Sequence, residues 1–161
     1  VCANLPYYIT SPIIMSLLEA RLPIVSLTVM VQKEAAQRLC AAPGSREVGA
    51  VSIAVQYYSQ PQVLFQVSRG SFMPSPDVDS TVIRLDVRQQ PPVQLKKEED
   101  FFRVVKAAFS QRRKTLPNTL SAGLAIPKQQ ALDLLERAGV ASNLRAEQLS
   151  MQQFADIANA L

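Results

Sequence analysis

The sequence opens with a tetrapeptide whose groups suit the binding of a flat molecule with an amino group, Asn4-Leu5-Pro6-Tyr7. The side-chain oxygen of Asn4 can accept a hydrogen bond from such an amine. Pro6 has no N–H and a fixed φ, which stiffens the carbonyl group that precedes it. Tyr7 offers an aromatic face on which a planar ring can stack. Taken alone, however, the tetrapeptide favours the simpler interpretation of an ordinary turn between a strand and a helix.

A second candidate is an aromatic residue on a loop that two prolines stiffen. Phe72 is followed by Pro74 and Pro76, and this spacing predicts a rigid loop that holds the ring in one place. Such a ring either fills the core under the loop or is presented to a ligand. The spacing by itself favours the core interpretation.

A third candidate is the run of cations Arg112-Arg113-Lys114, which suits contacts with the phosphates of a nucleic acid. We also expect the run to lie at the C-terminus of a helix, where each cation stabilises the helix dipole by about 0.3–1 kcal/mol. The two roles are compatible. Lys33 and Arg69 are weaker candidates, because an isolated cation is usually solvated surface.

The composition excludes several classes of site. The 161 residues include no histidine and only two cysteines, Cys2 and Cys40, which rules out a Ser-His-Asp triad, a Cys-His pair and a zinc cluster. We expect both thiols to be reduced core residues of a cytoplasmic protein, with no metal. No run of 18 apolar residues is available for a membrane span. The net charge of +4 suits an anionic partner but is also ordinary. The first residue is Val, from which we expect a cut or processed end.

The elements that must position these residues follow from periodicity. The first part of the chain predicts a helix from about Pro12 to Arg21 with Ser11 as N-cap, and then a buried strand covered on both faces at Ile24–Val31. A helix from Gln32 to about Cys40 comes next. After a loop at 42–49, residues 50–58 fit either a strand or a helix. Alternating segments at 63–67 and 81–87 predict two strands that flank the loop 68–79.

The proline pair at Pro91-Pro92 predicts a domain junction, with one domain at 1–90 and another at 91–161. Helical periodicity follows the junction, with acidic residues at the start of the first helix and the run 112–114 at its end. Pro127 opens another helix, and Gly139 is expected to be its left-handed cap. Ser150 and Gln153 form a capping box before a last helix. The second domain is therefore predicted to be helical.

The longer run from Asn4 to Ile14 resembles the rRNA adenine N6-dimethyltransferase family almost residue for residue. Three further blocks, at 31–34, 72–80 and 109–116, resemble the same family in order and spacing. The resemblance implies an α/β fold: the C-terminal half of a Rossmann-like class I methyltransferase sheet, followed by a small all-α domain. It also implies a strand that ends at Ala3 and favours a helix at 50–58.

The same resemblance implies a function. It is transfer of methyl groups from S-adenosylmethionine to N6 of adenines in 16S rRNA, with the small ribosomal subunit precursor as partner. Asn4 would contact the cofactor, and Asn4 with the Leu5 carbonyl would hold the amine next to Pro6. Tyr7 and Phe72 would clamp the base. The RNA contacts would come from Arg112, Arg113 and Lys114, and more weakly from Lys33 and Arg69.

The five glycines contain no Gly-x-Gly, the motif of the cofactor-binding loop in such enzymes. We therefore expect that loop to lie upstream of Val1, the chain alone to be inactive, and its exposed strand edges to favour self-association. Two alternatives remain. One is the 23S rRNA methyltransferase of the macrolide-resistance type, which shares the Asn4 and Phe72 motifs but which the 111–114 block and the helical tail disfavour. The other is a mainly non-catalytic, rRNA-binding ribosome-assembly factor.

Overall fold

The computed structural model describes residues 1–5 and 10–161, which form two compact units. The sheet unit contains residues 1–41 and 54–91, and the helical unit contains residues 42–53 and 92–161. The helical unit thus takes a segment from the middle of the first part of the sequence. The helix α3 (Ala50–Tyr58) begins in the helical unit and ends in the sheet unit.

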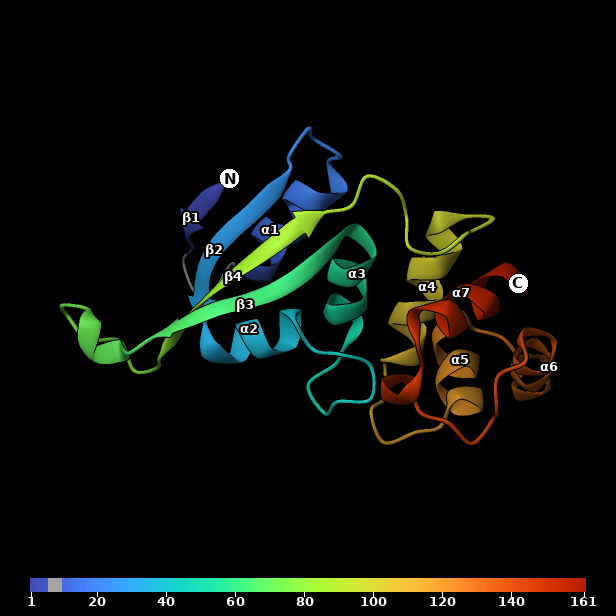
Figure 1. Ribbon diagram of the computed structural model, residues 1–161. Coiled ribbons are helices and arrows are strands. Elements are labelled where there is room, and N and C mark those ends of the chain that lie inside the picture. The colour runs from blue at the N-terminus through green and yellow to red at the C-terminus, as the bar shows by residue number, and fades with distance from the viewer. Residues whose placement is uncertain (6–9) are drawn as a thin grey trace. The chain divides into compact units, whose positions relative to one another are not determined.

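The sheet unit is built on four strands in the order β1-β2-β4-β3 (Figure 1). The strands are β1 (Cys2–Asn4), β2 (Ser26–Gln32), β3 (Ser59–Val67) and β4 (Ser80–Val87). β1 and β2 are parallel, and the helix α1 (Thr10–Glu19) joins them, as a parallel pair requires. β4 is antiparallel to both β2 and β3. The helix α2 (Lys33–Leu39) follows β2 directly.

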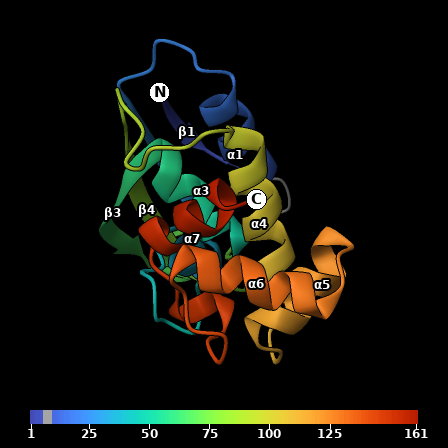
Figure 2. The same cartoon turned by 90° about the vertical axis from the view of Figure 1, so that its right-hand side faces the viewer.

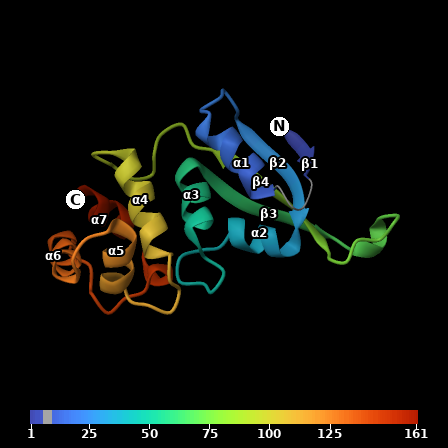
Figure 3. The same ribbon diagram turned by 180° about the vertical axis from the view of Figure 1, so that it is seen from behind.

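The two faces of the sheet differ in burial. On β2, Leu27, Val29 and Val31 are almost fully buried, whereas Thr28 and Met30 on the other face are only half-buried. α1 and α2 lie on one side of the sheet, as views from the front and from behind show (Figures 1 and 3). The prediction that β2 is covered on both faces was therefore wrong for this chain, because among the described residues α1 and α2 cover one face and leave the other half-buried.

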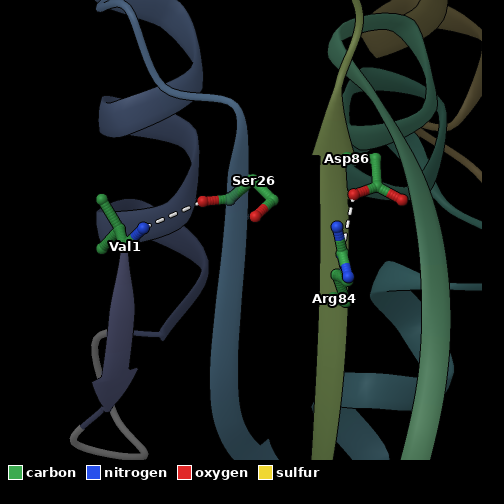
Figure 4. Close-up of polar contacts among 4 residues, drawn as sticks. All are labelled: Val1, Ser26, Arg84 and Asp86. Carbon is green, nitrogen blue, oxygen red and sulfur yellow. Dashed lines mark hydrogen bonds and ion pairs between the residues drawn. The ribbon is translucent and has the colours of Figure 1, made fainter.

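Polar contacts mark the open face and the β1 side of the sheet (Figure 4). On β4, the Arg84 guanidinium pairs with the Asp86 carboxylate two residues along the same face, with an Nε–Oδ1 distance of 2.8 Å. At the start of β1, the amino group of Val1 donates to the Ser26 carbonyl at 3.0 Å. Cys2, which we expected in the core, is exposed because β1 forms one edge of the sheet.

The sequence predicted most elements of the sheet unit. The strands ending near Ala3 and at 63–67 and 81–87 are confirmed, as are the helix after Gln32 and the helical choice for residues 50–58. The first helix begins at Thr10 rather than at Pro12, so Ser11 lies inside α1 and not at its N-cap. Helix ends are the least reliable part of such predictions, because a proline is tolerated anywhere in the first turn.

The helical unit is built around four helices (Figure 2): α4 (Glu98–Ala108), α5 (Leu116–Leu124), α6 (Lys128–Ala138) and α7 (Met151–Asn159). The short 3-10 turn η3 (Ala146–Gln148) precedes α7, and a similar turn, η2 (Arg69–Ser71), lies in the sheet unit. The largest side chains of this core are less than 2% exposed: Phe101, Leu116, Leu120, Leu134, Leu135 and Phe154.

Two predicted caps of the helical unit are confirmed. Gly139 ends α6 in the left-handed conformation with φ of 72°. Ser150 and Gln153 form the capping box of α7: the Ser150 hydroxyl accepts from the Gln153 N–H at 3.2 Å, and the Gln153 side-chain oxygen accepts from the Ser150 N–H at 2.9 Å. These local signals act within one helical turn, which is why the sequence predicts them well.

The predicted position of the cation run was wrong. α4 ends at Ala108, so Arg112 and the two cations after it lie beyond the helix, in the connection to α5. Just beyond the helix, the Ser110 hydroxyl donates to the Ala107 carbonyl at 2.7 Å and so satisfies one of the last carbonyl groups. The dipole argument for these cations therefore does not apply, since it holds only within the last turn.

The helix α5 was not predicted. Its signal is the repeat of Leu116, Leu120 and Leu124 at four-residue spacing, with Pro117 in the first turn. Gly123 marks the place where α5 meets α4. A Cβ built on Gly123 would lie 2.4 Å from the Ala107 Cβ and 2.6 Å from the Ala107 Cα. The two helices therefore cross at a distance that only glycine permits.

Among residues 1–5 and 10–161, no helix is both long and apolar enough to cross a lipid bilayer. Within the same part of the chain, no three side chains of the His, Cys, Asp and Glu types gather as a metal site would need.

Candidate functional site

The sheet brings the Asn4 motif and the loop that carries Phe72 to the same end of its strands. Asn4, the last residue of β1, pairs with Met30 near the end of β2. Gln32, the last residue of β2, pairs with Ser80, and Ser80 pairs with Val67 at the end of β3. The carboxyl ends of β1, β2 and β3 therefore lie at the same end of the sheet, which is its carboxyl edge. The loop 68–79, which carries Phe72, leaves the sheet from that same edge (Figures 1 and 3).

Asn4 is exposed at this edge, and the residue after it is held in place. The Leu5 side chain is buried, at 8% exposure, and the Leu5 N–H donates to the Met30 carbonyl at 3.3 Å. No hydrogen bond joins the Asn4 side chain to another described residue, and the residue is exposed. Pro6 and Tyr7, the other two members of the predicted motif, lie outside the described residues.

The loop 68–79 is closed by hydrogen bonds around Arg69. The Arg69 N–H donates to the Asp79 carboxylate at 2.9 Å, and its guanidinium Nη1 donates to the Asp77 carbonyl at 3.1 Å. The Ser75 hydroxyl donates to the Arg69 carbonyl at 2.9 Å. These contacts tie the two limbs of the loop together and do not depend on a ligand.

Asp79 also fastens the loop to the neighbouring element. Its carbonyl accepts from the N–H of Lys33, the first residue of α2, at 3.0 Å. Asp79 therefore joins the loop to the start of α2. Two of the weaker RNA candidates, Lys33 and Arg69, thus lie beside the edge that carries Asn4, and Arg69 has a structural task there.

Phe72 follows η2 and is half-buried, so part of its ring is open. Its N–H donates to the Arg69 carbonyl at 3.3 Å, which holds the main chain at this point. The next residue, Met73, is fully exposed, and the Met73–Pro74 peptide bond is cis. The loop therefore presents an aromatic ring and a long apolar side chain close together in sequence.

The cations of the run 112–114 lie in the helical unit and are exposed. Arg112 differs from its neighbours because its Nη1 donates to the Arg46 carbonyl at 3.1 Å. For the side chains of Arg113 and Lys114, no hydrogen bond or ion pair is found among the described residues. Sequence reasoning missed Arg46, and no local signal could have found a contact between residues 66 positions apart.

The two thiols differ in exposure. Burial raises the pKa of the Cys40 thiol to about 11, so this group is neutral at physiological pH. Cys2 is exposed on β1. Neither has a partner thiol, since both cysteines are free.

Comparison with known proteins identifies the family of this chain. A family model described as "Ribosomal RNA adenine dimethylase" matches residues 1–161. The chain belongs to this family. Among curated relatives, "Ribosomal RNA small subunit methyltransferase A" of Lachnoclostridium phytofermentans is 49% identical over 161 residues, which cover 99% of this chain and 56% of the relative. The protein of that name from Geobacillus thermodenitrificans is 51% identical over 164 residues, again 56% of its length.

Solved structures agree on the fold. A dimethyladenosine transferase from Plasmodium falciparum superposes with a TM-score of 0.83 at 26% identity, over 97% of this chain and 64% of that one. The 23S rRNA methyltransferase ErmE superposes with a TM-score of 0.71 at 24% identity, over 99% and 64%. The predicted mixed α/β, Rossmann-like fold is thereby confirmed. This member of the rRNA adenine dimethylase family spans about half the length of the curated relatives it matches.

Proposed function

We propose that the protein to which these residues belong transfers methyl groups from S-adenosylmethionine to N6 of adenines in 16S rRNA of the small ribosomal subunit precursor. The observation that carries the proposal is the shared sheet edge: an exposed Asn4 and the Phe72 loop leave the sheet at the same end. Family membership and the names of the relatives support it. The reaction needs no histidine, because the proton can leave after the amine has been methylated.

The chemical task is to hold a poor nucleophile. The lone pair of an adenine N6 amine is delocalised into the ring, and acceptors that bind its two N–H groups favour a pyramidal nitrogen and its growing positive charge. The Asn4 side-chain oxygen and the Leu5 carbonyl are the acceptors we propose. Burial of the Leu5 side chain and the hydrogen bond from the Leu5 N–H to the Met30 carbonyl fix the main chain at this point. Little further entropy is therefore lost when the Leu5 carbonyl is held in position for the amine.

We propose that Phe72 and Tyr7 stack on the two faces of the adenine after it has left its own stack. The loop contacts around Arg69 support this role for Phe72, because they hold its main chain before any ligand arrives. The partial exposure of Phe72 leaves a part of its ring available. A base pressed against a fixed ring loses less entropy on binding than one that must order the loop first.

S-adenosylmethionine would supply an electrophilic methyl group on its sulfonium. In this chain Asn4 is the residue proposed to contact it, and the fit rests on an exposed amide at the carboxyl end of a parallel strand pair, where ligands of α/β sheets bind. The sequence contains no Gly-x-Gly for the main cofactor contact. For the RNA, we propose phosphate contacts by Arg113 and Lys114 in the helical unit.

The proposal is tested by Asn4→Ala in a fusion of this chain to the upstream part of the Geobacillus thermodenitrificans relative. Loss of one acceptor for a developing charge lowers the rate about 10²–10³-fold. The assay follows the transfer of labelled methyl groups to small-subunit rRNA and maps the product. Asn143→Ala, an exposed amide in the helical unit, is the matched control and should leave the rate unchanged.

Three results would contradict the proposal or redirect it. Methylation that survives Asn4→Ala within a factor of two would exclude Asn4 from the site. Product in 23S rather than 16S rRNA would identify the macrolide-resistance type of enzyme. A ribosome-assembly defect that is complemented equally by the wild type and Asn4→Ala would make rRNA binding, rather than catalysis, the main role.

A further inference from the structure

We infer that Arg112 is a positioning residue that fastens the segment 42–49 to the helical unit, a role distinct from the phosphate contacts proposed for Arg113 and Lys114. The inference rests on the proposed function only where it concerns RNA. The attachment of the segment by Arg112, which we call the clamp, follows from contacts that lie wholly within the helical unit.

Two hydrogen bonds tie the segment 42–49 to different parts of the helical unit. The Arg112 Nη1 donates to the Arg46 carbonyl at 3.1 Å. The Gly44 N–H donates to the Glu147 carbonyl, in η3, at 2.7 Å. The segment is thus held from two sides, by the connection between α4 and α5 and by the turn before α7.

The guanidinium of Arg112 also lies against the end of the segment. A Cβ built on Gly49 would be 3.6 Å from Arg112 Nη2, which is ordinary contact distance. Beneath it is a crevice of about 10 Å³, lined by Val48, Ala108, Phe109, Gln111, Arg112, Ala146 and Glu147. A space of that size is at the lower limit for one water molecule. The side chain therefore covers a nearly filled contact between the segment and the helices.

The end of the segment is held differently from its middle. Val48 is 1% exposed and anchors its end by apolar contact. The Ser45 hydroxyl is buried and makes no hydrogen bond with any described residue. A planar guanidinium with five donors can reach the Arg46 carbonyl through one nitrogen while another lies at Gly49, which a lysine ammonium cannot do. Loss of the clamp therefore releases Arg46 and loosens the segment that leads into α3.

The segment matters for RNA because Arg46 is itself an exposed cation. Its main chain is joined to the run 112–114 by the clamp, so the clamp sets where this charge stands relative to Arg113 and Lys114. The bond to a neutral carbonyl leaves the charge of Arg112 in place. Electrostatics alone therefore does not distinguish Arg112 from Arg113, whereas a substitution that keeps the charge does.

The test compares Arg112→Lys with Arg113→Lys in this chain. Hydrogen exchange followed by mass spectrometry reports on the segment: we expect the amides around Gly44 to exchange about tenfold faster in Arg112→Lys, as for loss of one hydrogen bond to a charged group, and unchanged in Arg113→Lys. Circular dichroism should show the same helix content in both variants, because the clamp touches no helix interior.

RNA binding supplies the second readout, with a hairpin of 16S rRNA sequence as the probe. Arg112→Lys should bind about threefold to tenfold more weakly with an unchanged salt dependence, because every charge is retained. Arg113→Lys should bind as the wild type does, and Arg113→Gln should lower the slope of log K against log salt by about 0.9.

Unchanged exchange around Gly44 in Arg112→Lys would overturn the clamp, and so would equal loss of affinity in the two lysine variants. If the wild-type chain binds no RNA, the proposed RNA contacts fail, while the exchange measurement still decides whether Arg112 positions the segment.

Discussion

The close crossing of α4 and α5 allows the effect of one methyl group to be worked out. In Gly123→Ala the new Cβ would stand 2.4 Å from the Ala107 Cβ and 2.6 Å from the Ala107 Cα. Carbon atoms in contact stay about 3.5–4.0 Å apart. Because one of the clashing atoms belongs to the main chain, no side-chain rotation relieves it, and the helices must separate by roughly 1 Å.

Two opposing terms set the magnitude. Alanine in place of glycine favours a helix by about 1 kcal/mol. Overpacking of a close contact usually costs about 1–3 kcal/mol, and the upper part of that range applies when the backbone must move. We therefore expect the free energy of unfolding of the helical unit to fall by about 1–2 kcal/mol. For a unit of this size that lowers the midpoint of thermal unfolding by roughly 4–16 °C.

Circular dichroism melts measure the shift, and hydrogen exchange of the α4 amides assigns it to the crossing. Ala107→Gly in the Gly123→Ala background should restore part of the loss, since it removes the nearer of the two clashing atoms and leaves the other. Ala122→Gly, an exposed neighbour on α5, is the control: it loses helix propensity but leaves α4 protected.

A stability gain in Gly123→Ala would refute the reasoning, because it would mean that propensity alone acts and that the helices do not meet there. Additivity of the 107 and 123 substitutions within about 0.5 kcal/mol would have the same meaning.

Three further outcomes are expected. Ser150→Ala should destabilise the helical unit by about 1 kcal/mol in urea unfolding, because the Gln153 N–H loses its acceptor. At pH 7.5 an aromatic disulfide reagent should label Cys2 and spare Cys40. Cys40 should become reactive only on unfolding or as the pH approaches 11. The free energy of unfolding should fall as the pH rises from 9.0 to about 11, since the unfolded state ionises this thiol first. Calorimetric titration of this chain alone with S-adenosylmethionine should show no specific binding, and a micromolar dissociation constant would contradict our reading of Asn4 as its one cofactor contact.

Patterns within one element were the ones that the sequence predicted well. The alternation of 81–87 and the capping box at Ser150 depend on neighbours two or three residues away, so the printed sequence contains all the information they need. Apolar periodicity does not mark the exact end of a helix, and α4 ends at Ala108, before the cation run begins. For this reason the cations after it were placed on the wrong structure.

The candidate site was only partly predictable in its arrangement. Residue type and spacing made Asn4 and Phe72 candidates, and the family resemblance favoured a binding role over a turn or core role. Their common edge follows only from the antiparallel insertion of β4 between β2 and β3, which brings Ser80 beside Gln32. The exposure of Cys2 and the open face at Thr28 likewise depend on which elements flank the sheet. Residue type alone does not predict those elements.

The continuity of α3 limits how this protein can be cut or recombined. Its first residues belong with the helical unit and its last with the sheet unit, so a break at Pro91-Pro92 separates residues 42–53 from the rest of the helical unit. A shortened version ending at Pro91 would retain residues 42–53 but lose Glu147, the acceptor for the Gly44 N–H, together with every other partner of that segment beyond residue 91. An exchange of the helical unit between relatives would therefore require residues 42–53 and residues 92–161 to be exchanged together.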